Sequence, residues 1–338
     1  MNTLLKTAVS VVGLAGLATF YAPSQASGVE LKLASFTGPK HAMNRAFFTP
    51  WKKEVEKMSG GSLTIKMFVG GKLGKGGAKQ FKRAVDGVAD ISFGLQGYTS
   101  SQFRATTLIE LPNIAKDAVE ATRAMWAAYD GLLDKEYKNV KLLFMWSVDR
   151  PLIMTLKKPV RSLADLKGMK IRTPSQMQSK TIKALGAVPI PMSITKVYNG
   201  MARGLVDGVL TSTTTLQGFK LAEVTKYFTA GLPWGTSPMF LVMNKKSYEG
   251  LSPAHKAIID KTTGAKPSEL GARIYEKENA EGWDFIRKSS KHEFVEMNKA
   301  DLQKSLNIWK TTSREIIAET AARGVPAQKI VDKMLAAN

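Results

Sequence analysis

The stretch GMKIRTPSQ, residues 168–176, decides the fold because it joins a buried strand to the start of a helix. Apolar and basic residues alternate from Met169 to Arg172, which is typical of a strand with one buried face. Thr173 and Pro174 end this strand and predict a helix with Thr173 as its cap and Pro174 at its first position. In α/β proteins the carboxyl ends of the strands form the binding crevice. Arg172 is therefore either a solvated strand end or a residue that binds an anion.

The first 26 residues have the pattern of a secretory signal. One lysine precedes a short apolar run with small residues, and the sequence from Ser24 to Ala26 fits a small-x-small cleavage site. The run is shorter than a typical membrane-spanning helix, which favours a cleaved signal over an uncleaved membrane anchor. We predict cleavage after Ala26. Because no later stretch is apolar enough to cross a bilayer, we expect the remaining chain to be exported.

Composition excludes several classes of chemistry. The 338 residues include no cysteine, which excludes disulfides, thiol catalysis and cysteine-ligated zinc. The three histidines have no partner at HxxxH spacing, so we expect no metal and no cofactor. The formal net charge is +21, but the basic residues are spread along the chain without a basic tail. This pattern favours a solvated basic surface that attracts anionic solutes over a nucleic-acid-binding protein.

Strand-like and helix-like patterns alternate along the chain, which predicts an α/β fold with two lobes. A helical run from Pro267 to about Lys288 is long enough to bridge them. We assign residues 27–150 and about 239–277 to lobe I, and residues 151–238 and about 278–338, with the C-terminal helices, to lobe II.

Motifs of catalysis are incomplete. The glycine-rich loop GGKLGKGGAK, residues 70–79, fits neither nucleotide-binding pattern. The sequence SITK, residues 193–196, matches the first motif of penicillin-binding enzymes, but their other two motifs are missing. Asp207 lies in an Asp-Gly pair that is typical of a turn. We therefore predict no catalytic residue.

Polar and aromatic side chains gather instead at the predicted strand ends. Each alone is usually structural, and Trp146 in particular fits a core position as well as a crevice. Together they predict one crevice between the lobes. The set comprises Phe36, His41, Gln96, Tyr98, Trp146, Ser147, Arg172, Thr211, Ser212, Trp234 and Thr236.

Two longer stretches carry a family resemblance. The first is SGGSLTIKMFVGGKLG with VDGVADI, residues 59–74 and 85–91. The second and more specific is DLKGMKIRTP with LGAVPIPMSITKVYNGMARGLVDG, residues 165–174 and 185–208. The chain resembles the solute-binding proteins of TRAP transporters, the DctP type, over essentially its whole length after residue 26. The resemblance implies a type II-like periplasmic binding protein fold, with two α/β lobes that close on a ligand about a hinge and a long helix that spans both.

The resemblance also implies roles for individual residues. The arginine of the K-I-R strand, here Arg172, is expected to make a two-pronged salt bridge to the ligand carboxylate, which suits a guanidinium fork. Thr211 stands where many relatives have a ligand-contacting asparagine, so a hydroxyl replaces an amide and sialic-acid-like ligands do not fit the pattern. Arg150 is the nearest match to a second arginine of relatives, although its spacing differs.

We predict a periplasmic substrate-binding component of a TRAP transporter that delivers an organic acid to membrane permease subunits and is not an enzyme. The alternatives are an exported carboxylate receptor or scavenger without a TRAP permease, and an exported enzyme that uses the same cleft. Aromatic side chains in the set, Phe36, Tyr98, Trp146 and Trp234, suggest an apolar ligand body. A hydroxy acid, an oxo acid and a C4-dicarboxylate all fit a single arginine.

Overall fold

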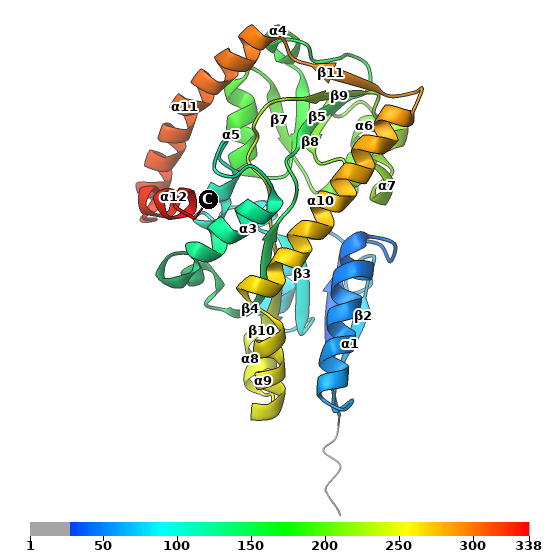
Figure 1. Cartoon of the computed structure of the whole chain (residues 1–338), viewed down its shortest axis with the longest axis vertical. Coiled ribbons are helices and arrows are strands. Elements are labelled where there is room, and N and C mark those ends of the chain that lie inside the picture. Colours follow the sequence, from blue (N-terminus) through cyan, green and yellow to red (C-terminus); the bar gives the residue numbers. More distant parts are fainter. Residues whose placement is uncertain (1–27, 338) are drawn as a thin grey trace, which may run out of the picture.

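A computed structural model of the chain describes residues 28–337, so the predicted signal at residues 1–26 lies outside it. Two separate β-sheets, one in each lobe, organise the described residues (Figure 1). The prediction of a two-lobe α/β fold is confirmed. We call the lobe around the five-stranded sheet lobe I and the lobe around the six-stranded sheet lobe II.

The sheet of lobe I has the strand order β2-β1-β3-β10-β4. Its first three strands are parallel, whereas β10 runs antiparallel between β3 and β4. Both faces are covered, and every residue of β3 and β10 is buried. The strands are β1 (Val29–Ser35), β2 (Leu63–Phe68), β3 (Ile91–Leu95), β4 (Val140–Ser147) and β10 (Pro238–Asn244).

The sheet of lobe II has the strand order β11-β9-β5-β8-β6-β7. Strands β6, β7 and β8 are parallel, and β5 runs antiparallel between β8 and β9. Arg172 lies on β6, opposite Ile190 of β7 and Val209 of β8. The strands are β5 (Leu152–Thr155), β6 (Lys170–Thr173), β7 (Val188–Pro191), β8 (Gly208–Thr211), β9 (Tyr227–Ala230) and β11 (Glu293–Glu296).

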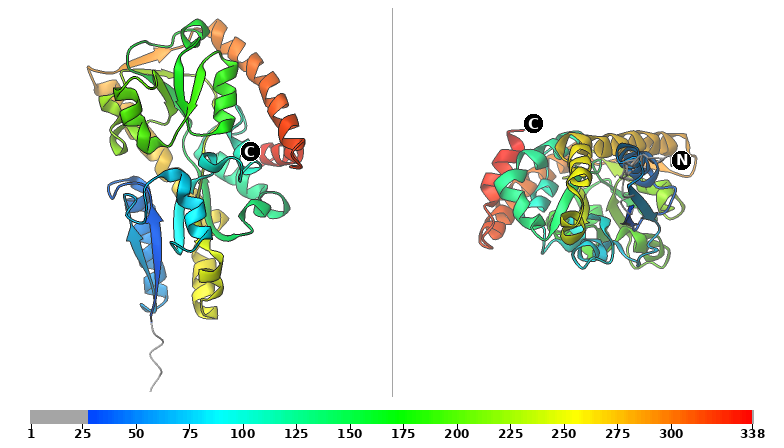
Figure 2. Two further views of the ribbon diagram at one scale, coloured as in Figure 1. Left: turned by 180° about the vertical axis from the view of Figure 1, so that it is seen from behind. Right: turned by 90° about the horizontal axis from the view of Figure 1, so that it is seen from below.

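Helices cover both sheets and connect the lobes (Figures 1 and 2). Those of lobe I are α1 (Thr49–Met58), α2 (Gln80–Val85), α3 (Ala118–Ala127), α8 (Lys245–Glu249) and α9 (Pro253–Thr262). Those of lobe II are α4 (Leu163–Leu166), α5 (Gln176–Ala184), α6 (Val197–Ala202) and α7 (Thr215–Gly218). The last three are α10 (Ala265–Lys288), α11 (Lys299–Ala321) and α12 (Ala327–Leu335).

The predicted bridging helix is α10, which begins two residues before Pro267. Its first half packs against α3 and β4 of lobe I, and its far end contacts β11 of lobe II. Gly271 lies against the Trp146 indole, where a Cβ atom would come within 2.9 Å of the ring. Only a residue without a side chain therefore lets the helix approach the sheet this closely.

The cap of α5 differs from the prediction. Ser175, and not Thr173, is the N-cap: its hydroxyl accepts a hydrogen bond from the backbone N–H of Gln178. Pro174 therefore precedes the cap and does not occupy the first helical position. The serine hydroxyl satisfies a backbone donor of the first turn that would otherwise stay unpaired, which sets the start of the helix here.

The C-terminal helices pass from one lobe to the other. Helix α11 lies along α5, where the Trp309 indole donates to the Thr181 carbonyl over 3.0 Å (Figure 2). Helix α12, which we assigned to lobe II from the sequence, packs against α3, with Ile330 and Met334 in the same apolar cluster as Met125. The exact residue boundaries of the lobes stay a prediction.

Candidate ligand-binding site

A cavity lies between the two lobes and encloses about 550 Å³ of space between atoms, including the part open to solvent. Lobe I contributes the ends of β1 and β3, the start of β10 and one residue of α10; lobe II contributes the ends of β6 and β8 and the first turn of α5. Its lining residues are Phe36, Thr37, His41, Leu95, Tyr98, Val148, Pro151, Arg172, Pro174, Gln178, Ile194, Leu210, Thr211, Ser212, Thr214, Thr215, Phe219, Ser237, Met239 and Tyr275.

Arg172 is the cationic group of this cavity. It is only 2 % exposed, and it is the one lysine or arginine among the lining residues within the described part of the chain. Its Nε donates to the Met192 carbonyl at 2.9 Å and its Nη1 to the Leu210 carbonyl at 3.3 Å. Nη2 is buried and has no hydrogen-bond partner among residues 28–337. The two carbonyls hold the guanidinium in place while Nη2 keeps its donors free.

The electrostatic state of Arg172 follows from its burial. Desolvation lowers the pKa of Arg172, and the nearby Tyr98 hydroxyl opposes this shift. The guanidinium stays charged because its pKa starts far above physiological pH. A buried cation with an unpaired donor is costly unless an anion compensates it. The geometry therefore suits an anionic ligand group at Nη2.

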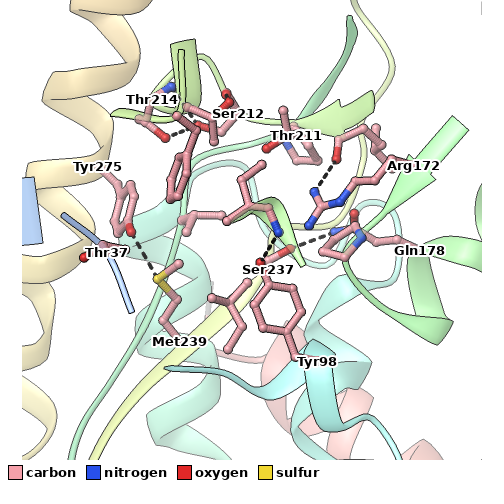
Figure 3. Close-up of a pocket in the computed structure, with 18 of the residues that line it drawn as sticks. Thr37, Tyr98, Arg172, Gln178, Thr211, Ser212, Thr214, Ser237, Met239 and Tyr275 are labelled. Atoms are coloured by element: carbon pink, nitrogen blue, oxygen red, sulfur yellow. Dashed lines mark hydrogen bonds between the residues drawn. The ribbon is translucent and has the colours of Figure 1, made fainter. Parts of the chain in front are cut away.

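Tyr98 connects the two lobes beside Arg172 (Figure 3). Its hydroxyl accepts a hydrogen bond from the backbone N–H of Ile194 at 2.9 Å. Its ring meets the Phe36 ring edge-on, with centroids 6.3 Å apart. One tyrosine thus lines the cavity with an aromatic face and joins lobe I to lobe II.

Away from Arg172 the cavity wall is mostly neutral. Tyr275 of α10 is 3 % exposed and donates to the Met239 sulfur at 3.1 Å. Burial, and secondarily Arg45, lower the pKa of His41 to about 4, so its imidazole is neutral at physiological pH. Its ring lies edge-on to those of Phe219 and Tyr275. This end of the cavity offers weak polar groups and no charge.

Two buried carboxyl groups lie near the cavity without lining it. Asp149, in the connection from β4 to β5, accepts a hydrogen bond from the Ser212 hydroxyl at 2.6 Å. Burial raises the pKa of Asp149 well above its ordinary value. Glu110 of lobe I is 1 % exposed and accepts a hydrogen bond from the hydroxyl of Ser175 in lobe II. Burial raises the pKa of Glu110 to about 8, which favours its neutral form.

The described residues hold no cluster of acidic or histidine side chains suited to a metal ion. Between residues 28 and 337, no helix is both long and apolar enough to cross a membrane.

Comparison of the sequence with protein-family models places the chain in a family. The model of the bacterial extracellular solute-binding proteins, family 7 (DctP), matches residues 33–322. The chain belongs to this family. Among curated proteins, the 2,3-diketo-L-gulonate-binding periplasmic protein YiaO of Escherichia coli is 28 % identical over 261 residues, 74 % of this chain and 76 % of YiaO.

Solved structures of TRAP solute-binding proteins share the fold of this DctP-family protein. One, from Rhodoferax ferrireducens with copurified benzoate, is 25 % identical with a TM-score of 0.87, covering 91 % of this chain and 97 % of its own. Another, from Bordetella bronchiseptica with bound (R)- and (S)-mandelate, is 25 % identical with a TM-score of 0.83, covering 91 % and 98 %.

From the sequence we assigned ligand binding to nine residues: Phe36, Gln96, Tyr98, Trp146, Arg150, Arg172, Thr211, Ser212 and Trp234. Five of them line the cavity of this solute-binding protein. These are Phe36, Tyr98, Arg172, Thr211 and Ser212. They lie at or just after the carboxyl ends of β1, β3, β6 and β8, which meet at the cavity. His41, also singled out from the sequence, joins them.

The other four predicted residues lie elsewhere. Trp146 is fully buried in the core of lobe I, stacked on Phe93. Trp234 packs against Trp309 under α11, with ring centroids 4.5 Å apart. Gln96 donates to the Tyr137 hydroxyl at 2.9 Å. Arg150 donates to the Ala115 carbonyl at 3.1 Å. Ser147 and Thr236, from the same set of strand ends, hydrogen-bond to each other and also lie outside the cavity lining.

Sequence reasoning missed several lining residues, among them Gln178, Ser237 and Tyr275. Gln178 could have been found, because it lies in the first turn of the helix that directly follows Arg172. Tyr275 lies four residues after Gly271, on the helix face that approaches lobe I. Ser237 follows a loop whose path depends on how the lobes meet, and no local pattern marks it.

Proposed function

We propose that this DctP-family protein captures a monocarboxylic organic acid in the periplasm and delivers it to the membrane permease subunits of a TRAP transporter. Family membership supports the transport role, and the cavity chemistry supports the ligand class. The proposed binding step is closure of the two lobes about the connections between them, with the acid enclosed at Arg172.

One observation carries the ligand assignment. The Arg172 guanidinium is buried at the cavity wall, is held by two carbonyls and keeps Nη2 unpaired within the described chain. A carboxylate there would compensate the charge and form short charge-assisted hydrogen bonds. The two-pronged clamp inferred from the resemblance is part of the proposal, with Nη2 as one of its donors.

The rest of the wall favours one carboxylate and an apolar body. No second lysine or arginine from the described residues lines the cavity, so a second carboxylate would be desolvated without a cation. Phe36, Leu95, Ile194, Phe219 and Met239 supply apolar surface. The relatives from R. ferrireducens and B. bronchiseptica hold benzoate and mandelate, both aromatic monocarboxylic acids. We therefore place aromatic monocarboxylic acids first among the ligands.

The test is a thermal-shift screen of carboxylic acids followed by calorimetry. A ligand that binds only the folded chain raises the melting temperature by mass action. Arg172→Ala should lose roughly 2–5 kcal/mol of binding free energy, about 30- to several-thousand-fold in affinity, because the bound carboxylate is left desolvated and unpaired.

Arg83→Ala is the matched control. Arg83 is also a buried arginine, 8 % exposed, but lies in lobe I outside the cavity lining. Both variants lose one positive charge, so a general basic field would weaken binding equally in both. Equal affinity of Arg172→Ala and Arg83→Ala for the acid would refute the assignment, and Arg150 would be tested next.

Two rivals predict other results. Turnover of a bound acid on prolonged incubation would favour an exported enzyme that uses the same cleft. Absence of TRAP permease genes beside this one would favour a carboxylate receptor or scavenger.

A further inference from the structure

Gln178 reaches the same wall of the cavity as Arg172, from the first turn of α5 (Figure 3). Its backbone N–H is fixed by the Ser175 cap, and the residue is only 1 % exposed. Its position is thus set by the same strand-to-helix connection that carries Arg172. The two side chains are presented together by one segment of seven residues.

The orientation of the Gln178 amide follows from its partners. Nε2 donates to the Gly235 carbonyl at 3.3 Å and to the Ser237 hydroxyl at 3.0 Å. A carbonyl oxygen can only accept, so the nitrogen must face Gly235 and the oxygen must face the other way. That oxygen, Oε1, is buried and has no hydrogen-bond partner in the described part of the chain.

The cavity wall therefore presents two buried atoms without hydrogen-bond partners, one a donor and the other an acceptor. Arg172 Nη2 is a donor and Gln178 Oε1 is an acceptor, neither with a partner among residues 28–337. Buried polar atoms are rarely left in this state, because each loses its hydrogen bonds to water. A ligand that completes both must carry an acceptor and a donor close together.

We propose that Gln178 determines specificity by accepting a hydrogen bond from a hydroxyl group on the carbon next to the ligand carboxylate. The inference rests on the proposed function, since it takes the carboxylate to bind at Arg172. A 2-hydroxy acid presents its carboxylate acceptor to Nη2 and its hydroxyl donor to Oε1. A 2-deoxy acid leaves Oε1 unpaired, and a 2-oxo acid brings a second acceptor against it. The site thus selects 2-hydroxy acids from the acids that the arginine admits.

The same geometry predicts a choice between mirror images. Gln178 lies on one side of the guanidinium, held there by Gly235 and Ser237. Exchanging the hydroxyl and hydrogen on the neighbouring carbon turns the donor away from Oε1. One enantiomer of a 2-hydroxy acid should therefore bind more tightly than the other.

The probes are three acids of one skeleton: each enantiomer of mandelate, phenylacetate and phenylglyoxylate, measured by calorimetry. Wild type should bind one mandelate enantiomer at least about tenfold more tightly than phenylacetate, since a buried unpaired acceptor is costly. Phenylglyoxylate should bind no more tightly than phenylacetate. In Gln178→Met the preference for mandelate should fall to within threefold.

Gln80→Met is the control variant. Gln80 is another 1 % exposed glutamine with its own hydrogen bonds, but it lies outside the cavity lining. It should keep the wild-type preference. If Gln178→Met fails to fold, the order in which wild type binds the three acids still tests the proposed role of Gln178.

The outcomes separate the two proposals. Equal binding of mandelate, phenylacetate and phenylglyoxylate to wild type overturns the role of Gln178 and leaves the carboxylate site intact. An undiminished mandelate preference in Gln178→Met does the same. If wild type binds none of the acids, or Arg172→Ala binds them as wild type does, the proposed function fails as well.

Discussion

Replacing Glu110 with glutamine should remove part of the pH dependence of folding. Glu110 is buried between the lobes, and the hydroxyl of Ser175 donates to its carboxyl group. Burial raises the pKa of Glu110 from 4.5 to about 8. Between these values the folded chain holds a proton that the unfolded chain has released. The stabilising contribution of the neutral form is therefore complete below pH 4.5 and is lost as the pH rises towards 8.

The size of this effect on stability follows from the difference between the two pKa values of Glu110. Each pH unit inside it changes the free energy of unfolding by about 1.4 kcal/mol per proton, so the whole interval accounts for about 5 kcal/mol. Glutamine cannot ionise and keeps an oxygen to accept from Ser175. From pH 5 to pH 8, Glu110→Gln should therefore gain about 4 kcal/mol of stability relative to wild type.

The assay is urea unfolding followed by tryptophan fluorescence at pH 5, 6.5 and 8. Other buried acids contribute equally to both proteins, so they cancel in the difference. Glu269→Gln is the control: the hydrogen bond from Arg123 lowers the pKa of Glu269, which is therefore ionised in both states across this range. The free energy of unfolding of Glu269→Gln should change with pH in parallel with that of wild type. If the free energy of unfolding of Glu110→Gln changed with pH as that of wild type does, within about 0.5 kcal/mol, a buried neutral carboxyl at Glu110 would be refuted.

Three further results are expected. Arg172→Lys should recover only part of the affinity lost in Arg172→Ala, since an ammonium group lacks the planar fork; calorimetry with one acid decides, and full recovery would contradict a directional clamp. Saturating ligand should reduce the radius of gyration in small-angle scattering, and an unchanged profile would indicate a rigid cleft. The secreted chain should begin at Ser27 by intact mass, whereas a full-length membrane-bound product would exclude cleavage at the predicted site.

The sequence pattern predicted those parts of the fold that depend on local periodicity. Alternation from Met169 to Arg172 correctly indicated a strand, β6, and the helical run from Pro267 correctly indicated α10. The α5 cap was misplaced because Thr173, Pro174 and Ser175 all carry start signals. The choice among them depends on which hydroxyl meets the Gln178 N–H in three dimensions.

The site was predictable where a residue lies at a strand end and its direction follows from the strand. Arg172 and Thr211 are of this kind, since they lie at the ends of β6 and β8, two neighbouring parallel strands. Trp146 and Trp234 also lie at or just beyond strands, yet both pack in cores that include helices distant in the sequence. Trp146 packs beneath α10 and Trp234 against Trp309, and neither the pattern of β4 nor that of the loop after β9 contains these partners.

The position of β10 in the lobe I sheet constrains when the chain can fold. Strand β10 lies between β3 and β4 and provides the ladder that joins them. Until residues 238–244 have been synthesised, the already completed β4 has no strand beside it, and its apolar residues lack their final neighbours. During synthesis from the N-terminus, the lobe I sheet would thus stay incomplete until more than two thirds of the chain has been made. Such delayed pairing makes truncation before residue 244 incompatible with an intact first lobe.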